Sequence, residues 1–119
     1  VINEVNKVRL PFNVNALSQK VAVEALQNGR KLKSDLRLII SERKGLFKGL
    51  RQIEGVTPYP SDANFIFFRV KDADEVYGQL LAKGVLVRNL NSAVKGCLRV
   101  TVGTPAENAA FLKVLRQVL

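Results

Sequence analysis

The 119 residues fit a single domain that can bury a core, and a composition of 47% hydrophobic and 24% charged residues argues against disorder. No apolar run approaches the length of about 18 residues that a membrane-spanning helix needs, and the absence of histidine removes the commonest metal ligand and general base, so we expect neither a membrane span nor a metal site. The net charge of +9 could indicate nucleic-acid binding, but the basic residues are spread along the chain without alternating aromatic residues, so we do not expect it.

The first half of the chain is predicted to be helical. Residues 5–15 lead into a helix, because Pro11 keeps the residue before it extended and Asn15 is a candidate N-cap. Gly29 is a plausible end of this helix, whose apolar residues recur at helical spacing at Leu17, Val21, Ala25 and Leu26. A second helix carries an apolar stripe over about six turns before Gly55 ends it. The stripe consists of Leu32, Leu36, Ile39, Ile40, Leu46, Phe47, Leu50 and Ile53.

In the second half, short strands alternate with helices. Residues 64–70 (NFIFFRV) are aromatic and β-branched, which predicts a buried strand. Asp72 and Glu75 form a capping-box pattern that starts a helix, which runs to Lys83 and stops at Gly84. The apolar runs at residues 85–87 and 98–102 predict two further strands.

The last predicted element is a helix with a strong start signal. Thr104 is the N-cap, Pro105 occupies the first helical position, and Glu107 is the reciprocal capping partner. Its buried stripe is Phe111, Leu112, Leu115 and Leu119. The order of elements predicts an α/β fold, in which a short sheet of about three strands is covered by helices and preceded by long helices.

Two arginines flank the loop between the last two predicted strands. Eight residues, 89–96, join these strands, so we expect antiparallel neighbours with Arg88 and Arg99 together at the loop end. Alternation places Arg99 on the face opposite to Leu98 and Val100, away from the core. Two guanidinium groups so placed suit two anionic groups on one small molecule, since arginine binds carboxylate or phosphate through paired N–H bonds. The alternative is a pair of solvated arginines without a ligand.

Several motifs together resemble the C-terminal region of one enzyme family. "GVLVRNL" (84–90) and "GCLRVTVGTPAEN" (96–108) are similar to histidinol-phosphate aminotransferases, fold-type I enzymes that depend on pyridoxal 5′-phosphate. "KVRLPFNVNALSQ" (7–19) and "SDANFIFFRV" (61–70) occur in family-like form and in the same order, so the resemblance covers essentially the whole chain. Parts of the most specific motif, "LRVTVGTPAEN", are shared with related aminotransferases and with threonine-phosphate decarboxylase.

The resemblance implies roles for both arginines. Arg99 matches the arginine that holds the substrate α-carboxylate, and Arg88 matches one that contacts the phosphate of histidinol phosphate. The expected partners are therefore small anionic substrates, an amino acid and a phosphate ester. The family converts histidinol phosphate and 2-oxoglutarate into imidazole acetol phosphate and glutamate in histidine biosynthesis.

The resemblance also implies a larger protein. Residues 1–119 would form one small C-terminal domain with its long entry helices, and the large domain that binds pyridoxal phosphate would lie outside this chain. We expect the full-length enzyme to be a homodimer. A cytoplasmic location is also expected, and the single Cys97, which cannot form an internal disulfide, fits a reducing compartment.

No residue of this chain is expected to be catalytic, to bind the cofactor or to bind a metal. In the family, the lysine that forms a Schiff base with the cofactor belongs to a Ser-x-Ser/Thr-Lys motif N-terminal to this segment, so the chain alone is expected to be inactive. "SERKGLFKGLR" (41–51) is superficially similar. However, Lys44 falls on the exposed side of a long helix, whereas a Schiff-base lysine needs a desolvated pocket or cationic neighbours.

Other residues have weaker signals. Asn64 is a weak candidate for orienting an active-site group, and a turn or strand-start role is the simpler alternative. Phe12 and Asn13 are expected to serve in packing and capping, and Cys97 as a small buried residue. Two functional alternatives stay open: another fold-type I enzyme, such as an aromatic aminotransferase or threonine-phosphate decarboxylase, and a basic α/β module that binds RNA.

Overall fold

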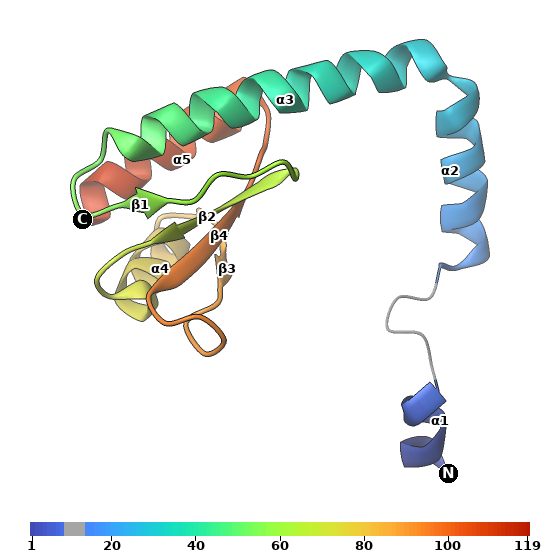
Figure 1. Ribbon diagram of the computed structural model, residues 1–119, viewed down its shortest axis with the longest axis horizontal. Coiled ribbons are helices and arrows are strands. Elements are labelled where there is room, and N and C mark those ends of the chain that lie inside the picture. The colour runs from blue at the N-terminus through green and yellow to red at the C-terminus, as the bar shows by residue number, and fades with distance from the viewer. Residues whose placement is uncertain (9–13) are drawn as a thin grey trace. The chain divides into compact units, whose positions relative to one another are not determined.

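The computed structural model describes residues 1–8 and 14–119. The predictions for Pro11, Phe12 and Asn13 fall on residues 9–13 and so lie outside the described residues. The chain divides into two compact units, Val1–Ser34 and Asp35–Leu119. Figure 1 shows the helices and strands that they contain. Within the described ranges, no helix combines the length and the apolar character needed to cross a membrane.

The first unit is helical. α1 spans Ile2–Val8, where the sequence had predicted only a segment leading into a helix, so the prediction missed this element. α2 spans Ala16–Gln27 and begins as predicted, because the side chain of Asn15 accepts a hydrogen bond from the backbone N–H of Ser18 at 2.9 Å.

The end of α2 differs from the prediction. Asn28 is the C-cap, and its backbone N–H donates to the carbonyl of Glu24 at 3.1 Å. Gly29 does not have a positive φ, so it is not the left-handed residue that commonly ends a helix. It is instead the first residue of α3, which spans Gly29–Arg51.

The apolar stripe of α2 is exposed. Leu17 is 73% exposed, Val21 55% and Leu26 69%. The spacing of these residues predicted the helix correctly, but no other described element of the first unit covers its apolar face. The pattern therefore identifies a face that needs a partner without identifying the partner.

Only the C-terminal part of α3 enters a core. Leu46 and Leu50 are fully buried, whereas Leu36 and Ile40 are about half exposed. The helix ends at Arg51, and Gly55, which has a φ of 77°, lies in the turn that follows. A glycine is favoured there because residues with a side chain rarely adopt this backbone conformation.

The second unit contains an antiparallel sheet of four strands in the order β1-β2-β4-β3 (Figure 1). The strands are β1 (Thr57–Pro58), β2 (Phe65–Arg69), β3 (Arg88–Asn89) and β4 (Cys97–Thr101). About three strands were predicted, and β1 was missed. A two-residue edge strand that includes a proline has almost no recognisable strand pattern.

The run at residues 85–87 is not a strand, which corrects the prediction. The ladder with β4 begins only at Arg88. An open cavity lies between Val85 and Leu86 on one side and Val100 and Thr101 on the other.

α4 spans Ala73–Ala82. Asp72 caps it as predicted, accepting from the backbone N–H of Glu75 at 3.0 Å. The predicted reciprocal bond is absent from the described helix, and the carboxylate of Glu75 accepts from Gln79 at 3.1 Å. The helix is followed by Gly84, whose φ of 76° fits its predicted role as a stop.

α5 spans Pro105–Val118 and has the complete capping box that the sequence predicted. The hydroxyl of Thr104 accepts from the backbone N–H of Glu107 at 3.3 Å, and the Glu107 carboxylate accepts from the backbone N–H of Thr104 at 2.7 Å. Phe111 and Leu115 are buried, but the terminal Leu119 is 51% exposed.

Three helices and one face of the sheet form the core of the second unit. α3, α4 and α5 pack onto alternate residues of β2 and β4, which confirms the predicted α/β fold. The most deeply buried members are Leu46, Leu50, Ile66, Phe68, Leu80, Leu98 and Leu115. The opposite face of β4 is therefore free of the core and available for a site.

Candidate anion-binding site

Arg88 and Arg99 lie directly opposite each other on neighbouring antiparallel strands. The register pairs Arg88 with Arg99 and Asn89 with Leu98. Residues directly opposite each other in an antiparallel pair project to the same face of the sheet. The structure thus brings together the two arginines that the sequence singled out, although Arg88 lies within β3 itself and not after a longer strand.

Arg99 projects from the face of β4 that does not form the core. Leu98 and Val100 on the other face are 0% and 5% exposed, whereas Arg99 is half-buried. The guanidinium carbon of Arg99 lies 4.9 Å from the centroid of the Phe65 ring on β2. This cation–π contact helps to hold the guanidinium in place.

Both arginines line one open cavity of about 410 Å³. This volume is within the range of small-molecule sites, which is about 300–1,000 Å³. The other lining residues are Tyr77, Leu86, Val87, Asn89 and Thr101. Sequence reasoning missed Thr101 as a site residue, although it was placed on the same face as Arg99, two positions further along the strand. Tyr77 had no such signal, because the sequence does not show where α4 packs.

The two guanidinium groups are uncompensated. Neither Arg88 nor Arg99 forms an ion pair with a carboxylate in the part of the chain that the structure describes. Like charges directly opposite each other destabilise a strand pair. An anion with two acidic groups would relieve this repulsion and accept paired N–H bonds, so the arrangement suits a small dianionic ligand.

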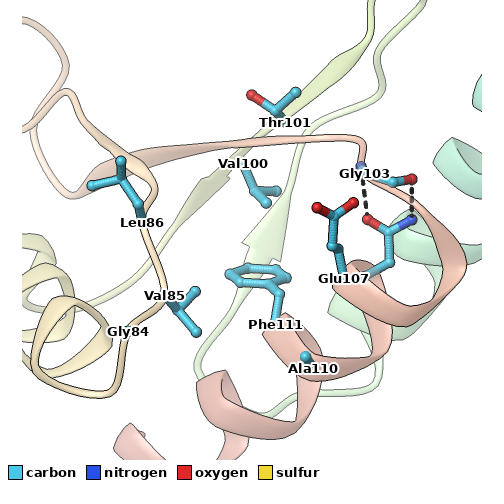
Figure 2. Close-up of a pocket in the computed structure, with 10 residues that line it drawn as sticks. Gly84, Val85, Leu86, Val100, Thr101, Gly103, Glu107, Ala110 and Phe111 are labelled. Carbon is cyan, nitrogen blue, oxygen red and sulfur yellow. Dashed lines mark hydrogen bonds between the residues drawn. The ribbon is translucent and has the colours of Figure 1, made fainter.

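A second open cavity, of about 510 Å³, lies beside the first and shares Leu86 and Thr101 with it. Figure 2 shows Glu107 and Phe111 of α5 on one side of this cavity. Hydrogen bonds from the backbone N–H and hydroxyl of Thr104 keep the pKa of the Glu107 carboxyl below its usual value. Because Glu107 is committed to capping α5, the described lining offers no free charged group for a ligand.

Asn108 fixes the end of β4 beside this second cavity. Its side-chain oxygen accepts from the N–H of Gly103 at 3.0 Å, and its side-chain nitrogen donates to the carbonyl of Gly103 at 3.0 Å and to Glu42 at 2.9 Å. Asn108 is only 6% exposed, so these bonds satisfy a buried amide. The strand that carries Arg99 is therefore tied to α5 and α3.

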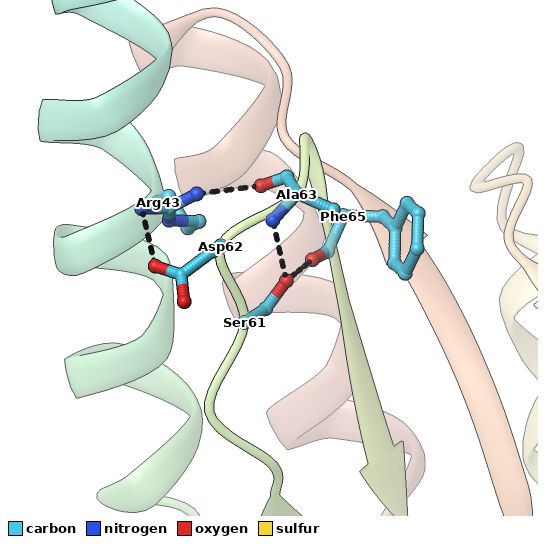
Figure 3. A network of polar contacts seen from close by, with 5 residues as sticks. All are labelled: Arg43, Ser61, Asp62, Ala63 and Phe65. Atoms are coloured by element: carbon cyan, nitrogen blue, oxygen red, sulfur yellow. Dashed lines mark hydrogen bonds and ion pairs between the residues drawn. The ribbon is translucent and has the colours of Figure 1, made fainter.

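A polar network orders the turn that leads into β2 (Figure 3). Arg43 of α3 donates to the carbonyl of Ala63 at 2.9 Å and contacts Asp62 at 3.4 Å. The hydroxyl of Ser61 donates to the carbonyl of Phe65 at 2.6 Å and accepts from the N–H of Ala63 at 3.1 Å. This network fixes the start of β2, and with it the ring that lies against Arg99.

Asn64, the weak sequence candidate, belongs to this turn and does not line the arginine cavity. Its side chain is exposed, and its carbonyl accepts from the backbone N–H of Val102 at 2.8 Å. This bond joins Asn64 to the residue after β4, as expected for a strand-start role. The structure does not bring Asn64 together with the two arginines as a lining residue.

The remaining singled-out residues lie as expected. Lys44 is exposed on α3, and Cys97 is buried at 2% exposure. Among residues 1–8 and 14–119, no group of three or more acidic, cysteine or histidine side chains is placed to hold a metal ion.

The sequence matches the family model described as aminotransferase class I and II over residues 1–115. It is 44% identical to a histidinol-phosphate aminotransferase of Aquifex aeolicus, over 98% of this chain and 34% of that protein. It is 45% identical to histidinol-phosphate aminotransferase 2 of Nitrosococcus oceani, over 97% of this chain and 33% of that protein. The chain thus spans about a third of the length of these relatives.

Solved structures share the fold. A histidinol-phosphate aminotransferase from Clostridium acetobutylicum superposes with a TM-score of 0.78 at 21% identity, over 98% of this chain and 36% of that one. The enzyme of the same name from Sinorhizobium meliloti, solved with pyridoxal-5′-phosphate, gives 0.76 at 21% identity, over 98% and 33%. An L-threonine-O-3-phosphate decarboxylase from Porphyromonas gingivalis gives 0.64 at 25% identity, over 98% and 38%.

Proposed function

Because this chain belongs to the aminotransferase class I and II family, we propose that it is the C-terminal part of a histidinol-phosphate aminotransferase. The full-length protein would exchange an amino group between histidinol phosphate and 2-oxoglutarate, giving imidazole acetol phosphate and glutamate. In this reaction Arg99 binds the α-carboxylate of glutamate, and Arg88 binds the phosphate of histidinol phosphate.

The observation that supports these roles best is the direct pairing of Arg88 with Arg99 over one cavity. Glutamate has two carboxylates, whereas histidinol phosphate has a phosphate and no α-carboxylate. A site that accepts both must therefore bind anions of different shape in one place. Two uncompensated arginines on adjacent strands meet this requirement, because each can form paired N–H bonds with carboxylate or phosphate.

We propose that pyridoxal phosphate is held by the remainder of the protein. When bound, this cofactor supplies the electron sink for amino-group chemistry. The described residues fit the substrate side of such a site: Lys44 is exposed and not desolvated, whereas Arg88 and Arg99 face a cavity of substrate size. This chain would thus bind and orient the substrate, would be inactive alone, and would work with its own large domain in a homodimer.

The test is a substrate panel on the full-length protein. We expect amino transfer from L-histidinol phosphate to 2-oxoglutarate to be the fastest reaction. Its rate is measured by the formation of glutamate. Arg99→Ala should abolish most of it. Arg69→Ala is the matched control, because Arg69 is an exposed arginine of the same sheet outside the arginine cavity.

Threonine-phosphate decarboxylation is the second candidate, favoured by the fold shared with the Porphyromonas gingivalis enzyme. Its substrate combines a carboxylate with a phosphate in one molecule, so the same two arginines could bind it. Release of CO₂ from L-threonine O-3-phosphate without amino transfer would replace the first proposal by this one. Salt-sensitive association with RNA and no reaction with either substrate would instead support the RNA-binding alternative.

A further inference from the structure

The strand that carries Arg88 has little support from the sheet. β3 contains two residues, lies at the edge of the sheet, and pairs only with β4 (Figure 1). One of its two residue pairs places Arg88 opposite Arg99, where like charges oppose the pairing. Other contacts must therefore hold Arg88 in its place.

A carboxylate on α4 provides such contacts. Asp74, in the first turn of α4, accepts one hydrogen bond on each oxygen: Oδ1 from Nδ2 of Asn89 and Oδ2 from Nδ2 of Asn91, both at 2.6 Å. Asn89 is the second residue of β3, and Asn91 lies two residues further along the loop to β4. One side chain thus joins the helix to both the strand and its loop.

The side-chain amides of Asn89 and Asn91 are both oriented so that their NH₂ groups donate, and the residue at position 74 must therefore offer two acceptor atoms. The side-chain oxygen of Asn89 accepts from the N–H of Asn91 at 2.8 Å, and that of Asn91 accepts from the N–H of Gly96 at 2.7 Å. Both NH₂ groups must therefore turn towards an acceptor. Aspartate offers two acceptor oxygens, whereas asparagine would offer one oxygen and one NH₂ group facing another donor. The two bonds also lower the pKa of the Asp74 carboxyl, so it is charged at neutral pH.

Asp74 and the two asparagines that it binds, Asn89 and Asn91, form a clamp between α4 and the β3 strand with its loop. Residues next to this clamp belong to the candidate site. Asn89 follows Arg88 directly and lines the same cavity. Tyr77, three residues after Asp74 and so about one helical turn away, also lines it. α4 thus supplies part of the cavity wall and fixes the strand opposite Arg99.

We propose that Asp74 is a positioning residue that holds Arg88 in the anion cavity and thereby sets the affinity for the phosphate-bearing substrate. This inference rests on the function proposed above. Asp74 itself does not line the cavity and is not expected to touch the substrate. Its effect should accordingly appear in phosphate-substrate binding and pass through Arg88.

The experiment is a double-mutant cycle in the full-length protein with its cofactor. Asp74→Asn, Arg88→Ala and the double variant are compared with the unchanged protein by steady-state kinetics with L-histidinol phosphate and by the half-reaction with glutamate. We expect Asp74→Asn to raise KM for L-histidinol phosphate about tenfold, as for loss of one charge-assisted contact, with kcat and the glutamate half-reaction within about twofold. In the double variant, Asp74→Asn should add almost nothing to the effect of Arg88→Ala.

Glu75→Gln is the matched control. It makes the same change from carboxylate to amide one residue further along α4, where, among the described residues, the carboxylate accepts only from Gln79 of the same helix. It should leave KM unchanged. If Asp74→Asn does not yield folded protein, Asn91→Ala breaks the same clamp from the loop side and takes its place in the cycle.

The double-mutant cycle distinguishes failure of the Asp74 proposal from failure of the proposed function. A KM for L-histidinol phosphate that is unchanged in Asp74→Asn while Arg88→Ala raises it would overturn the positioning role and leave the proposed function intact. Additive effects in the double variant, or equal losses with both substrates, would show that Asp74 acts on the fold and not through Arg88. No effect of Arg88→Ala itself would overturn both the phosphate role of Arg88 and the inference built on it.

Discussion

Replacing Arg99 by lysine separates the charge at this position from its geometry. Arg99→Lys keeps a cation above the Phe65 ring, where the guanidinium carbon now lies 4.9 Å from the ring centroid. It removes the planar fork with which arginine binds both oxygens of a carboxylate. If Arg99 binds the α-carboxylate of glutamate, conserving its charge should therefore not preserve binding.

The expected magnitude follows from the contacts that are lost. Lysine can replace only one of the two hydrogen bonds that arginine makes to a carboxylate. The lost charge-assisted bond contributes about 1.5–3 kcal/mol, or about ten- to a hundredfold in glutamate binding. The half-reaction should also slow, because the grip fixes the orientation of the reacting carbon. Stability should change by less than about 1 kcal/mol, since Arg99 is half-buried and a cation over the ring is retained.

The assay is the single-turnover reaction of the full-length protein with glutamate, together with a thermal melt in the absence of substrate. Arg69→Lys provides the control, because it makes the same exchange on an exposed arginine of β2 outside the cavity. Glutamate kinetics within about twofold of the unchanged protein would refute the carboxylate role. A melting temperature that falls strongly without any effect on glutamate would show that Arg99 is a structural residue.

Three further predictions follow from the same structure. Arg88→Ala in the full-length protein should weaken use of histidinol phosphate by about ten- to a hundredfold and glutamate far less, as KM values for both will show. Arg43→Met should lower the free energy of unfolding by about 1–3 kcal/mol in urea, because the Ala63 carbonyl loses its donor. The folded-state pKa of Glu107 is lowered, so its capping bond stabilises the fold above its ordinary pKa of 4.5 and is lost as pH falls through the folded value. Glu107→Gln should therefore be less stable than the unchanged protein at pH 7, and this difference should disappear in strong acid. A difference in stability that does not depend on pH would contradict the prediction.

The fold could be predicted where local chemistry determines it. The caps at Asn15, Asp72 and Thr104 were found because a side-chain acceptor three residues before a backbone N–H is a purely local arrangement. The short edge strands could not be found this way. β1 is two residues long, and the run before Arg88 has strand-like composition but lies across a cavity from β4.

The α2 stripe shows a different limit of sequence reasoning. Leu17, Val21 and Leu26 have the spacing of a buried helix face, yet all three are more than half exposed. Amphipathic spacing reports that a face is apolar and says nothing about what covers it. By contrast, the stripe of α5 is covered at Phe111 and Leu115, because the sheet that it requires lies within the same unit.

The two arginines were found from the sequence because strand pairing is a short-range property here. A loop of eight residues between two strands predicts antiparallel neighbours and so places both arginines at the loop end, whereas the direct pairing of Arg88 with Arg99 is known from the structure alone. The residues around them were missed, because Tyr77 and Asp74 reach the hairpin from α4 through packing that leaves no pattern in the sequence.

The uncompensated charge of the arginine pair and the clamp on β3 are two parts of one physical arrangement. Without an anion, Arg88 and Arg99 repel each other across a strand pair of only two residues. If nothing else held β3, the hairpin could relieve this repulsion by opening, and a ligand would have to bring the arginines together again at a cost in affinity. Asp74 bonds to the two asparagines and so opposes that opening. The repulsion then stays in the ligand-free site, and its relief can contribute to binding a substrate with two negative groups.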